Sequence, residues 1–369
     1  MTATTAALSA QGVAIWLDDL SRARLATGDL ADLVAQQDVV GVTTNPAIFR
    51  SAISGSGAGD YTADIRRLKA EGADAERIVR VLTTDDVRQA CDLLHPVWEA
   101  TDGQDGRVSI EVDPRLAHDT DATTRQAREL WTEVDRENLL IKIPGTQAGL
   151  PAIRATIAAG ISVNVTLLFA VDRYRQVLDA YHAGLEDRLA AGEAIDRIHS
   201  VASFFVSRVD TAVDPLLAEH HDAAAAELAG TAAIANARLA YAAFLDTADS
   251  DRWQALEEAG ANPQRPLWAS TGVKNPAYPP TLYVDELVAP GTVNTMPEAT
   301  LQAVVDGQAV IADTITPNLD HARAVIAQLS ELGIDLEAVT PDLEAAGVTA
   351  FEEAWTALLA AVEQRRHTG

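Results

Sequence analysis

The stretch Asn-Leu-Leu-Ile-Lys-Ile-Pro-Gly (138–145) decides the fold, because it places one lysine inside a short apolar and β-branched run. A run of this length, closed by Pro-Gly, is typical of a strand buried on both faces, as in a parallel sheet. The chain has only three lysines, Lys69, Lys142 and Lys274, among its 28 lysines and arginines. Lys142 either snorkels to solvent or pairs with a carboxylate, or it is an amine that forms a Schiff base with a carbonyl substrate. This stretch alone leaves both interpretations open.

Seven further short apolar runs accompany this strand, and segments with helical periodicity separate most of them. The expected strands are 13–17, 39–44, 107–112, 139–144, 161–168, 198–206, 266–271 and 291–295. Strands that alternate with helices predict an α/β fold, here a single (β/α)8 TIM barrel with extra helices. A doubly wound open sheet is the alternative, but no Gly-x-Gly-x-x-Gly motif and no P-loop follows any strand.

Four segments are expected to lie outside the regular barrel repeat of this single domain, which spans residues 1–369. The length is ordinary for one α/β barrel with additions. Residues 1–11 are small and polar and predict a flexible leader, and the Gly/Ser-rich residues 50–60 predict a mobile loop. The Ala-rich residues 222–260 predict a helical insertion, and residues 349–365 predict an amphipathic C-terminal helix.

The composition indicates a cytoplasmic protein without a nucleic-acid or membrane partner. The formal net charge is −26, which argues against binding to nucleic acid or to an anionic membrane. No apolar run is expected to reach membrane-spanning length, and the N-terminus has no secretion signal. Cys91 is the only cysteine, which excludes an internal disulfide and a thiolate metal cluster. The oligomeric state is left open between monomer and homodimer.

Polar residues gather at one end of the expected strands. In a closed parallel barrel the carboxyl ends of all strands face one mouth, where barrel enzymes place their active sites. Each residue alone has a simpler explanation, because Asn and Asp often begin turns and Ser or Thr often satisfies a backbone group. The same pattern on seven strands favours an active site at the mouth. Its members are Asp18, Asn45, Glu111, Lys142, Asn164, Thr166, Ser203 and Ser270.

These residue types suit the cleavage of a carbon–carbon bond through a Schiff base. Glu111, helped by Thr166 and a water, would move protons while the carbinolamine formed at Lys142 becomes an imine. Asp18 would remove a hydroxyl proton and so trigger the cleavage. No metal is needed, because the imine is the electron sink, and the eight histidines show no spacing typical of ligands.

Neutral and basic side chains would hold the substrate. The amides of Asn45 and Asn164 would hold hydroxyl groups without competing as acids. Arg208, Ser270 and Lys274 would bind a phosphate. Because the chain is strongly acidic, a basic residue beside an apolar strand is more informative than usual.

Five motifs, in family order along the chain, resemble the transaldolase family. The similarity extends from about residue 13 to the final helix. The length and the segment Trp-Ala-Ser-Thr-Gly-Val-Lys-Asn-Pro-Ala-Tyr (268–278) look like the longer bacterial type found in actinobacteria. The motifs are Gly-Val-Thr-Thr-Asn-Pro (41–46), Ser-Ile-Glu-Val-Asp (109–113), Leu-Ile-Lys-Ile-Pro (140–144), Asn-Val-Thr-Leu-Leu-Phe (164–169) and Ser-Phe-Phe-Val-Ser-Arg-Val-Asp (203–210).

The resemblance implies a class I aldolase barrel without a cofactor, acting as a transferase in the non-oxidative pentose phosphate pathway. Such enzymes move a dihydroxyacetone unit from sedoheptulose 7-phosphate to glyceraldehyde 3-phosphate, which gives erythrose 4-phosphate and fructose 6-phosphate. The expected partners are therefore phosphorylated ketose and aldose substrates. By position, Lys142 matches the Schiff-base lysine, Asp18 the acid/base, and Glu111 with Thr166 the pair that positions a water.

The resemblance also assigns the substrate contacts. Asn45, Asn164 and Ser203 match residues that hold the dihydroxyacetone portion, Arg208 matches the phosphate-binding arginine, and Phe205 lines the site.

Two features depart from the pattern or rest on it alone. The family's common Ala-Ser-Phe-Arg-Asn phosphate segment is here Ala-Ser-Thr-Gly-Val-Lys-Asn, two residues longer and with lysine for arginine, which affects Ser270 and Lys274. The choice of Asp18 over Asp19 rests on the resemblance.

The rival functions are a fructose 6-phosphate aldolase, which releases free dihydroxyacetone, and a non-catalytic barrel that binds sugar phosphates.

Overall fold

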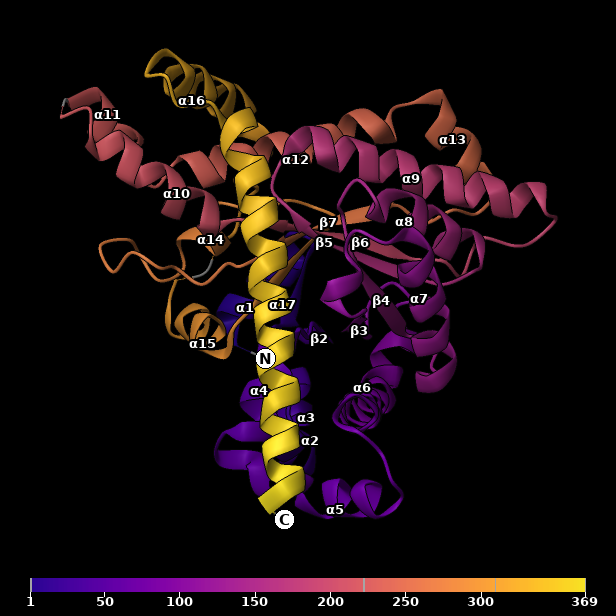
Figure 1. Ribbon diagram of the computed structural model, residues 1–369. Helices are drawn as coiled ribbons and strands as arrows, with labels where there is room; N and C mark the ends of the chain where they lie inside the picture. The colour runs from indigo at the N-terminus through magenta and orange to yellow at the C-terminus, as the bar shows by residue number, and fades with distance from the viewer. Residues whose placement is uncertain (1, 222, 309, 369) are drawn as a thin grey trace.

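A closed barrel of eight parallel strands forms the centre of the protein, as the sequence predicts (Figure 1). The computed structural model describes residues 2–221, 223–308 and 310–368. The strands follow one another around the barrel in chain order, and all the pairs are parallel. They are β1 (Val13–Leu17), β2 (Val39–Val42), β3 (Arg107–Glu111), β4 (Leu139–Pro144), β5 (Val163–Leu168), β6 (Ser200–Phe205), β7 (Gln264–Ala269) and β8 (Thr292–Met296).

The strands are buried on both faces because helices surround the barrel. Every residue of β4 is buried, as expected for strands of a parallel sheet. The pairing register sets Lys142 of β4 beside Glu111 of β3 and beside Asn164 of β5. Side chains in register on neighbouring strands face the same side of the sheet. The register therefore brings three of the predicted site residues to one level of the barrel.

Helix α1 (Ala3–Ala10) precedes β1. The other α-helices either cross between consecutive strands or follow the last strand. The crossovers are α2 (Arg22–Thr27), α3 (Asp29–Gln36), α4 (Pro46–Ser54), α5 (Thr62–Ala70), α6 (Ala75–Ala100), α7 (Thr120–Val134), α8 (Gly149–Ala158), α9 (Val171–Ala190), α10 (Ser207–Ala218), α11 (Ala223–Leu228), α12 (Ala232–Ala248), α13 (Asp251–Glu258) and α14 (Leu282–Asp285). After β8 come α15 (Glu298–Asp306), α16 (Leu319–Glu331) and α17 (Leu336–Thr368).

Side-chain caps define where several of these helices begin. The Ser21 hydroxyl accepts the backbone N–H of Arg24 at the start of α2. The Asn45 side chain accepts two backbone N–H groups of α4, which has Pro46 in its first turn. Caps of this kind satisfy N–H groups that have no partner within the helix. Asn45 therefore shapes the chain where β2 leads into α4.

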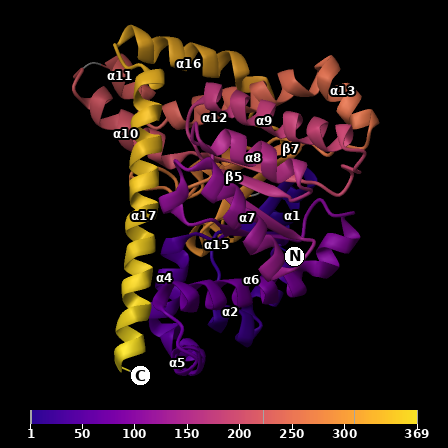
Figure 2. The ribbon, with the colours of Figure 1, turned by 45° about the vertical axis from the view of Figure 1, so that its right-hand side comes forward.

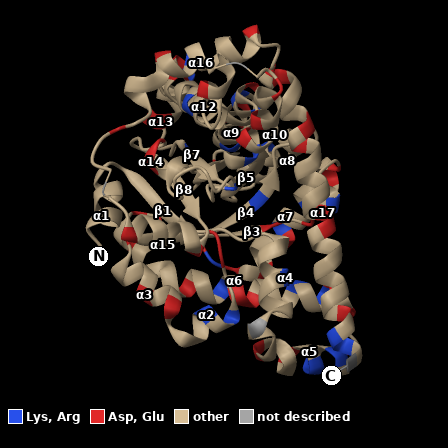
Figure 3. Cartoon of the chain, turned by 90° about the vertical axis from the view of Figure 1, so that its left-hand side faces the viewer, with Lys and Arg blue, Asp and Glu red and all other residues tan. Residues whose placement is uncertain are grey.

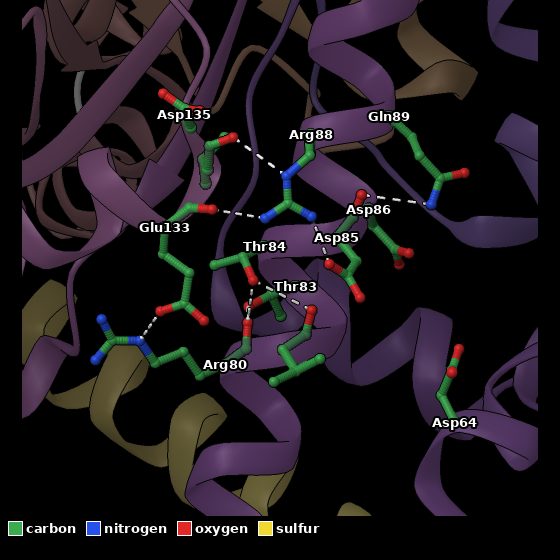
Figure 4. A network of polar contacts seen from close by, with 12 residues as sticks. Asp64, Arg80, Thr83, Thr84, Asp85, Asp86, Arg88, Gln89, Glu133 and Asp135 are labelled. Atoms are coloured by element: carbon green, nitrogen blue, oxygen red, sulfur yellow. Dashed lines mark hydrogen bonds and ion pairs between the residues drawn. The ribbon is translucent and has the colours of Figure 1, made fainter. Parts of the chain in front are cut away.

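Arginines of α6 hold the C-terminal end of α7 through its backbone (Figure 4). Arg88 donates from Nε to the carbonyl of Val134 at 3.2 Å and from Nη2 to the carbonyl of Glu133 at 2.6 Å. Arg80 pairs with the Glu133 carboxylate. Helix C-termini carry partial negative charge and unpaired carbonyls, which a guanidinium satisfies. The two helices that flank β3 are thereby fixed against each other.

The expectation of a flexible leader at residues 1–11 is wrong for the part of it that the structure describes. Helix α1 (Ala3–Ala10) is capped by Thr2. Its Leu8 side chain is 2% exposed and belongs to the core. The Thr5 hydroxyl also donates to the Asp38 carboxylate. The sequence pattern did not predict this helix, because its residues are small and Leu8 is the one large apolar side chain on it. Contacts with the rest of the protein keep it ordered.

The expectation of a mobile loop at 50–60 is also wrong. Helix α4 continues to Ser54 and a 3-10 helix, η1 (Ser56–Tyr61), follows it. Tyr61 is fully buried, and its hydroxyl donates to the Asp86 carboxylate at 2.7 Å. A Cβ on Gly55 would lie 2.5 Å from the Ser51 carbonyl oxygen, so this glycine allows the tight turn between α4 and η1.

The Ala-rich segment after β6 is helical, as predicted, and consists of α11, α12 and α13 among the described residues. Alanines of α12 such as Ala237 and Ala240 are completely buried. The small side chains let α12 pack closely between α9, α16 and β7. The segment is therefore a crossover of the barrel, enlarged by two short helices.

The C-terminal helix is much longer than the expected 349–365, because α17 begins at Leu336. It runs past the barrel from α10 to α4 and α5 (Figures 1 and 2). Among the described residues, Leu336–His367 is long and apolar enough to cross a membrane by length and composition alone. The expectation that no segment reaches that length is thus wrong, although this criterion is weak support for a membrane span. Phe351, Leu358 and Val362 of α17 are buried against the protein.

Charged residues of both signs are interspersed on the outer helices on the side drawn in Figure 3. Several form ion pairs between neighbouring helices, such as Arg252 with Glu186 at 2.6 Å. Exposed pairs of this kind contribute little stability individually. Basic residues on that side therefore lie among acidic ones.

Candidate active site

Lys142 lies near the carboxyl end of β4 and is almost completely buried, with 4% of its surface exposed. Its Nζ lies 3.3 Å from Glu111 Oε2 and donates to the Thr44 carbonyl at 3.1 Å. The aromatic ring of Phe351, from α17, lies 5.4 Å from the same nitrogen. The snorkelling interpretation is therefore wrong. The amine is held inside the barrel beside a carboxyl group.

Glu111 is the immediate neighbour of this amine. Both of its carboxyl oxygens are buried and make no hydrogen bond of good geometry within the described residues. Burial raises the pKa of Glu111 to about 7, and the charge of Lys142 opposes that rise. A carboxyl group that titrates near neutral pH can both donate and accept a proton under ordinary conditions. Glu111 is thus suited to a proton relay at Lys142.

Asp18 follows β1 directly, on another side of the barrel mouth. The Thr43 hydroxyl donates to its Oδ1 at 2.7 Å, and that hydroxyl also lies 2.6 Å from Thr295 Oγ1. Burial raises the pKa of Asp18, while Lys142 and the bond from Thr43 lower it. Asp19 instead pairs with Arg24 on the outer side. The structure therefore separates two adjacent aspartates that sequence alternation could not distinguish.

Asn164 has its side chain fixed by two serines inside the barrel. Its amide nitrogen donates to Ser109 Oγ at 3.0 Å, and its carbonyl oxygen accepts the Ser203 hydroxyl at 2.7 Å. Thr166 is fully buried on the same strand, and its hydroxyl has no partner among the described residues. A buried hydroxyl without a partner is costly. Thr166 thus has unused capacity to bind a water or a substrate group.

Asn45 reaches the mouth from the end of β2. Its side-chain oxygen is used by the backbone of α4, at 3.0 Å from Ala47 N and 3.1 Å from Ile48 N. The amide NH2 remains the part of the side chain that can donate to a ligand. A cavity of about 300 Å³ begins at Asn45 and Glu111 and extends outward to Arg77 and Trp355.

Phe205 and Arg208 form one wall of the mouth at the end of β6. The Phe205 ring packs against Phe169 at 5.2 Å and against Phe351 at 6.5 Å. The guanidinium of Arg208 lies 5.3 Å from the Phe205 ring. Among the residues that the structure describes, Arg208 makes no ion pair, and burial lowers its pKa. An arginine without a carboxylate at a barrel mouth is free to bind an anion.

The predicted phosphate residues after β7 differ in their placement. Ser270 lies directly beyond β7 with a left-handed backbone, φ +55°, and its hydroxyl is 3.0 Å from that of Ser207. Ser207 precedes Arg208, so Ser270 and Arg208 belong to one region. Lys274 is exposed on the loop that follows, and its charge acts on Asp18. The structure thus places Ser270 beside Ser207, the neighbour of Arg208 in the chain, and leaves Lys274 at the rim.

Four contacts of the site were missed by sequence reasoning. Three are hydrogen bonds: from Thr43 to Asp18, from Asn164 to Ser109, and from Lys142 to the Thr44 carbonyl. The fourth is the contact of the Phe351 ring with the lysine. Thr43, Thr44 and Ser109 lie in motifs that the sequence already singled out. Phe351 had no such signal, because it lies more than 200 residues beyond Lys142 in a helix with ordinary amphipathic spacing.

Helix α17 closes the mouth from outside. Gly347 permits this close approach, since a Cβ there would lie 3.0 Å from Leu167 and 3.7 Å from Arg208 Nη1. Arg365, at the far end of the helix, donates to the Ile53 carbonyl and to Thr62. Over the described part of the chain, no three His, Cys, Asp or Glu side chains are grouped as metal ligands.

Comparison with known proteins agrees with the motifs. The family model described as Transaldolase/Fructose-6-phosphate aldolase matches residues 15–362. A protein named transaldolase from Mycobacterium tuberculosis (strain CDC 1551 / Oshkosh) is 58% identical over 363 residues, which cover 98% of this chain and 96% of the relative. A transaldolase of Mycobacterium marinum is 59% identical over 359 residues, covering 97% and 96%. One of Parafrankia sp. (strain EAN1pec) is 56% identical over 358 residues, covering 97% and 96%.

The family model begins within β1 and ends within α17, so it includes the lysine strand and most of the helix that closes the mouth. The resemblance inferred from five motifs is confirmed. The chain therefore belongs to the transaldolase/fructose-6-phosphate aldolase family.

Proposed function

We propose that the protein is a cytoplasmic transaldolase that moves a dihydroxyacetone unit between phosphorylated sugars through a Schiff base at Lys142. The donor is sedoheptulose 7-phosphate and the acceptor is glyceraldehyde 3-phosphate. The observation that carries the proposal is the buried contact of 3.3 Å between Lys142 Nζ and Glu111. The relatives that are 56–59% identical are named transaldolase, which favours the transferase over the aldolase alternative.

Imine formation begins when Lys142 Nζ, as the neutral amine, attacks the C2 carbonyl of the ketose. The carbinolamine then loses its hydroxyl group as water, for which Glu111 supplies the proton. Its pKa of about 7 suits this transfer, because the acid is readily protonated again near neutral pH. Thr166, whose hydroxyl has no protein partner, holds the water that connects the acid to the reacting oxygen.

Carbon–carbon cleavage follows from the other side of the mouth. Asp18 takes the proton from the C4 hydroxyl, the C3–C4 bond breaks, and the aldose leaves as an aldehyde. The electron pair of that bond enters the iminium group and leaves an enamine on Lys142. The acceptor aldehyde then reacts at C3 of the enamine, and Asp18 returns its proton to the new hydroxyl group.

Substrate binding uses the neutral side chains near the lysine and the basic side chains farther out. The hydroxyl groups of the dihydroxyacetone unit bind to Asn164, Ser203 and the amide of Asn45. Ser203 already donates a hydrogen bond of 2.7 Å to Asn164. Arg208 binds the phosphate at the other end, with Ser270 beside it and Lys274 at the rim. Phe205 forms the apolar wall between the two ends. Neither a metal nor a cofactor takes part.

The test is chemical trapping. Borohydride reduction in the presence of fructose 6-phosphate should fix a dihydroxyacetone adduct on the peptide that contains Lys142, detected by mass spectrometry. Lys142→Arg should give no adduct and no turnover, because a guanidinium keeps its charge, while circular dichroism shows an intact fold. An unlabelled peptide from the unmodified protein refutes the Schiff base and also supports the non-catalytic sugar-phosphate barrel.

A second assay separates the transferase from the aldolase. Erythrose 4-phosphate and fructose 6-phosphate are supplied together, and the products are quantified. Formation of sedoheptulose 7-phosphate supports the transferase. Free dihydroxyacetone in place of sedoheptulose 7-phosphate overturns it in favour of the aldolase.

A further inference from the structure

A second group of buried charges lies at the opposite end of the barrel from Lys142. Arg107 is the first residue of β3, Arg265 is the second of β7, and His199 directly precedes β6. Their exposed fractions are 1%, 6% and 8%. The amino ends of barrel strands contribute to stability and not to catalysis. The proposed transferase reaction leaves this group without a role.

The positive charge there exceeds the negative charge. Arg265 Nη2 pairs with Asp105 Oδ1 at 2.7 Å. Arg107 donates only to neutral oxygens, the Gly103 carbonyl at 2.7 Å and more distant groups of Glu137 and Ser162. No described carboxylate forms an ion pair with Arg107. Two buried guanidiniums therefore share one buried carboxylate.

This imbalance is costly at every ordinary pH. Burial and the charge of Arg265 lower the pKa of Arg107 to about 9, so the guanidinium remains charged at neutral pH. Burial and the nearby arginines lower the pKa of His199 to about 2, so its ring is neutral. Arg197 adds a third positive charge, 5.6 Å from the Trp98 ring. Burying a charge without a partner costs on the order of several kcal/mol.

Three side-chain nitrogens converge beside this charge. The indole Nε1 of Trp98 is buried without a partner, and Trp98 is 8% exposed. A Cβ built on Gly103 would lie 3.2 Å from this nitrogen, 3.3 Å from His199 Nε2 and 3.4 Å from Arg107 Nη2. Three ring or guanidinium nitrogens thus face the same side of one glycine. The indole and guanidinium N–H groups of this set can only donate hydrogen bonds, so they favour an anion.

There is also space for a small ligand. A cavity of about 20 Å³ lies beside these nitrogens, with the exposed Gln104 at its edge. Its lining combines the basic or polar Arg107, His199, Arg265, Ser200 and Asn262 with the apolar Leu140, Val201 and Pro263. A space of that size holds about one water-sized sphere. It is too small for a sugar phosphate.

We propose that this cavity binds one small monovalent anion of halide size, which balances the charges of Arg107 and Arg265 and stabilises the barrel. A small anion is the ligand we expect, because the cavity is small and two guanidinium groups, those of Arg107 and Arg265, line it. Binding selects the folded protein, since Arg107 and Arg265 are 158 positions apart in the chain. Stability should accordingly rise with the concentration of the anion.

Thermal unfolding in two sodium salts of equal ionic strength tests the proposal. Sodium chloride provides the halide, and sodium gluconate provides an anion that is too large for the cavity. The full-length protein should gain about 2–5 °C in Tm in chloride relative to gluconate, with saturation as the site fills. Screening cannot produce this difference, because both salts screen equally.

A substitution at the edge of the cavity provides the decisive comparison. Gln104→Glu places a carboxylate beside the arginines, so this variant should be stabilised in gluconate and should lose the response to chloride. Gln254→Glu makes the same charge change on the exposed face of α13 and should keep the full response. An equal chloride response in both variants, or none in the unmodified protein, overturns the proposal. Transferase activity of Gln104→Glu should remain unchanged, since the cavity is at the far end of the barrel.

Discussion

Replacing Glu111 by glutamine should change how stability depends on pH, because this carboxyl group is buried beside Lys142. The pKa of Glu111 is raised from an ordinary 4.5 to about 7 by burial. The folded protein therefore holds a proton that the unfolded chain has released over this interval. The contribution of Glu111 to stability is fully present below about pH 4.5, and it is lost as the pH rises to about 7.

The magnitude follows from the difference between the two pKa values. One pKa unit corresponds to about 1.4 kcal/mol, so the whole interval corresponds to about 3 kcal/mol. Glu111→Gln keeps the volume and removes the titration. The variant should therefore gain about 3 kcal/mol relative to the unmodified protein between about pH 4.5 and about pH 8.

Urea unfolding at several pH values measures this quantity directly. Buried acids that do not act on Glu111, such as Asp210, titrate in both proteins and cancel in the difference. Glu337→Gln, on the exposed side of α17, is a control for the loss of one carboxylate. A difference between Glu111→Gln and the unmodified protein that stays constant over the whole pH range would refute the raised pKa.

The same variant tests the proton relay. A positioned acid or base contributes about 10²- to 10⁴-fold to a proton-transfer step. Glu111→Gln should slow the formation of the borohydride-trapped adduct at Lys142 by about that factor. If trapping proceeds at the normal rate while stability changes as expected, Glu111 is a buried acid without a catalytic role.

Three further substitutions separate the steps of the proposed reaction. Asp18→Asn should slow carbon–carbon cleavage about 10²-fold or more while imine trapping at Lys142 continues; equal loss of both steps would contradict the assignment. Arg208→Ala should raise KM about 10- to 100-fold for phosphorylated ketoses and leave unphosphorylated analogues little affected, and an equal rise for both would exclude phosphate binding. Ser109→Ala should leave the buried Asn164 amide nitrogen without its 3.0 Å acceptor and cost about 1–3 kcal/mol in urea unfolding, whereas an unchanged midpoint would show that a water replaces the hydroxyl.

Helix α17 shows why part of the site could not be predicted. Its register on the barrel depends on Gly347, which allows contact with Leu167, and on Arg365, which binds the backbone beyond α4. Only in that register does Phe351 lie over Lys142. Helical spacing indicates which face of a helix is apolar, but it does not indicate which surface that face covers.

The sequence by itself determined the elements and the kinds of residue at their ends. Short apolar runs and helical spacing are local patterns, so they predicted the eight strands, the closed barrel and the polar ring that includes Asp18, Glu111 and Lys142. The order of alternating strands and helices is enough to place all strand ends at one mouth. The five motifs then indicated the family before any geometry was known.

Only the tertiary structure decided which of these groups touch and which conformations the small-residue segments adopt. It ordered α1 through the burial of Leu8, and it buried Glu111 3.3 Å from Lys142. That burial raises the pKa of Glu111, and the charge of Lys142 opposes the rise. It also gathered Arg107 and Arg265 at the opposite end of the barrel. These outcomes depend on desolvation and on contacts between residues far apart in the chain. Closing the barrel creates both at once, and no local pattern in the sequence records them.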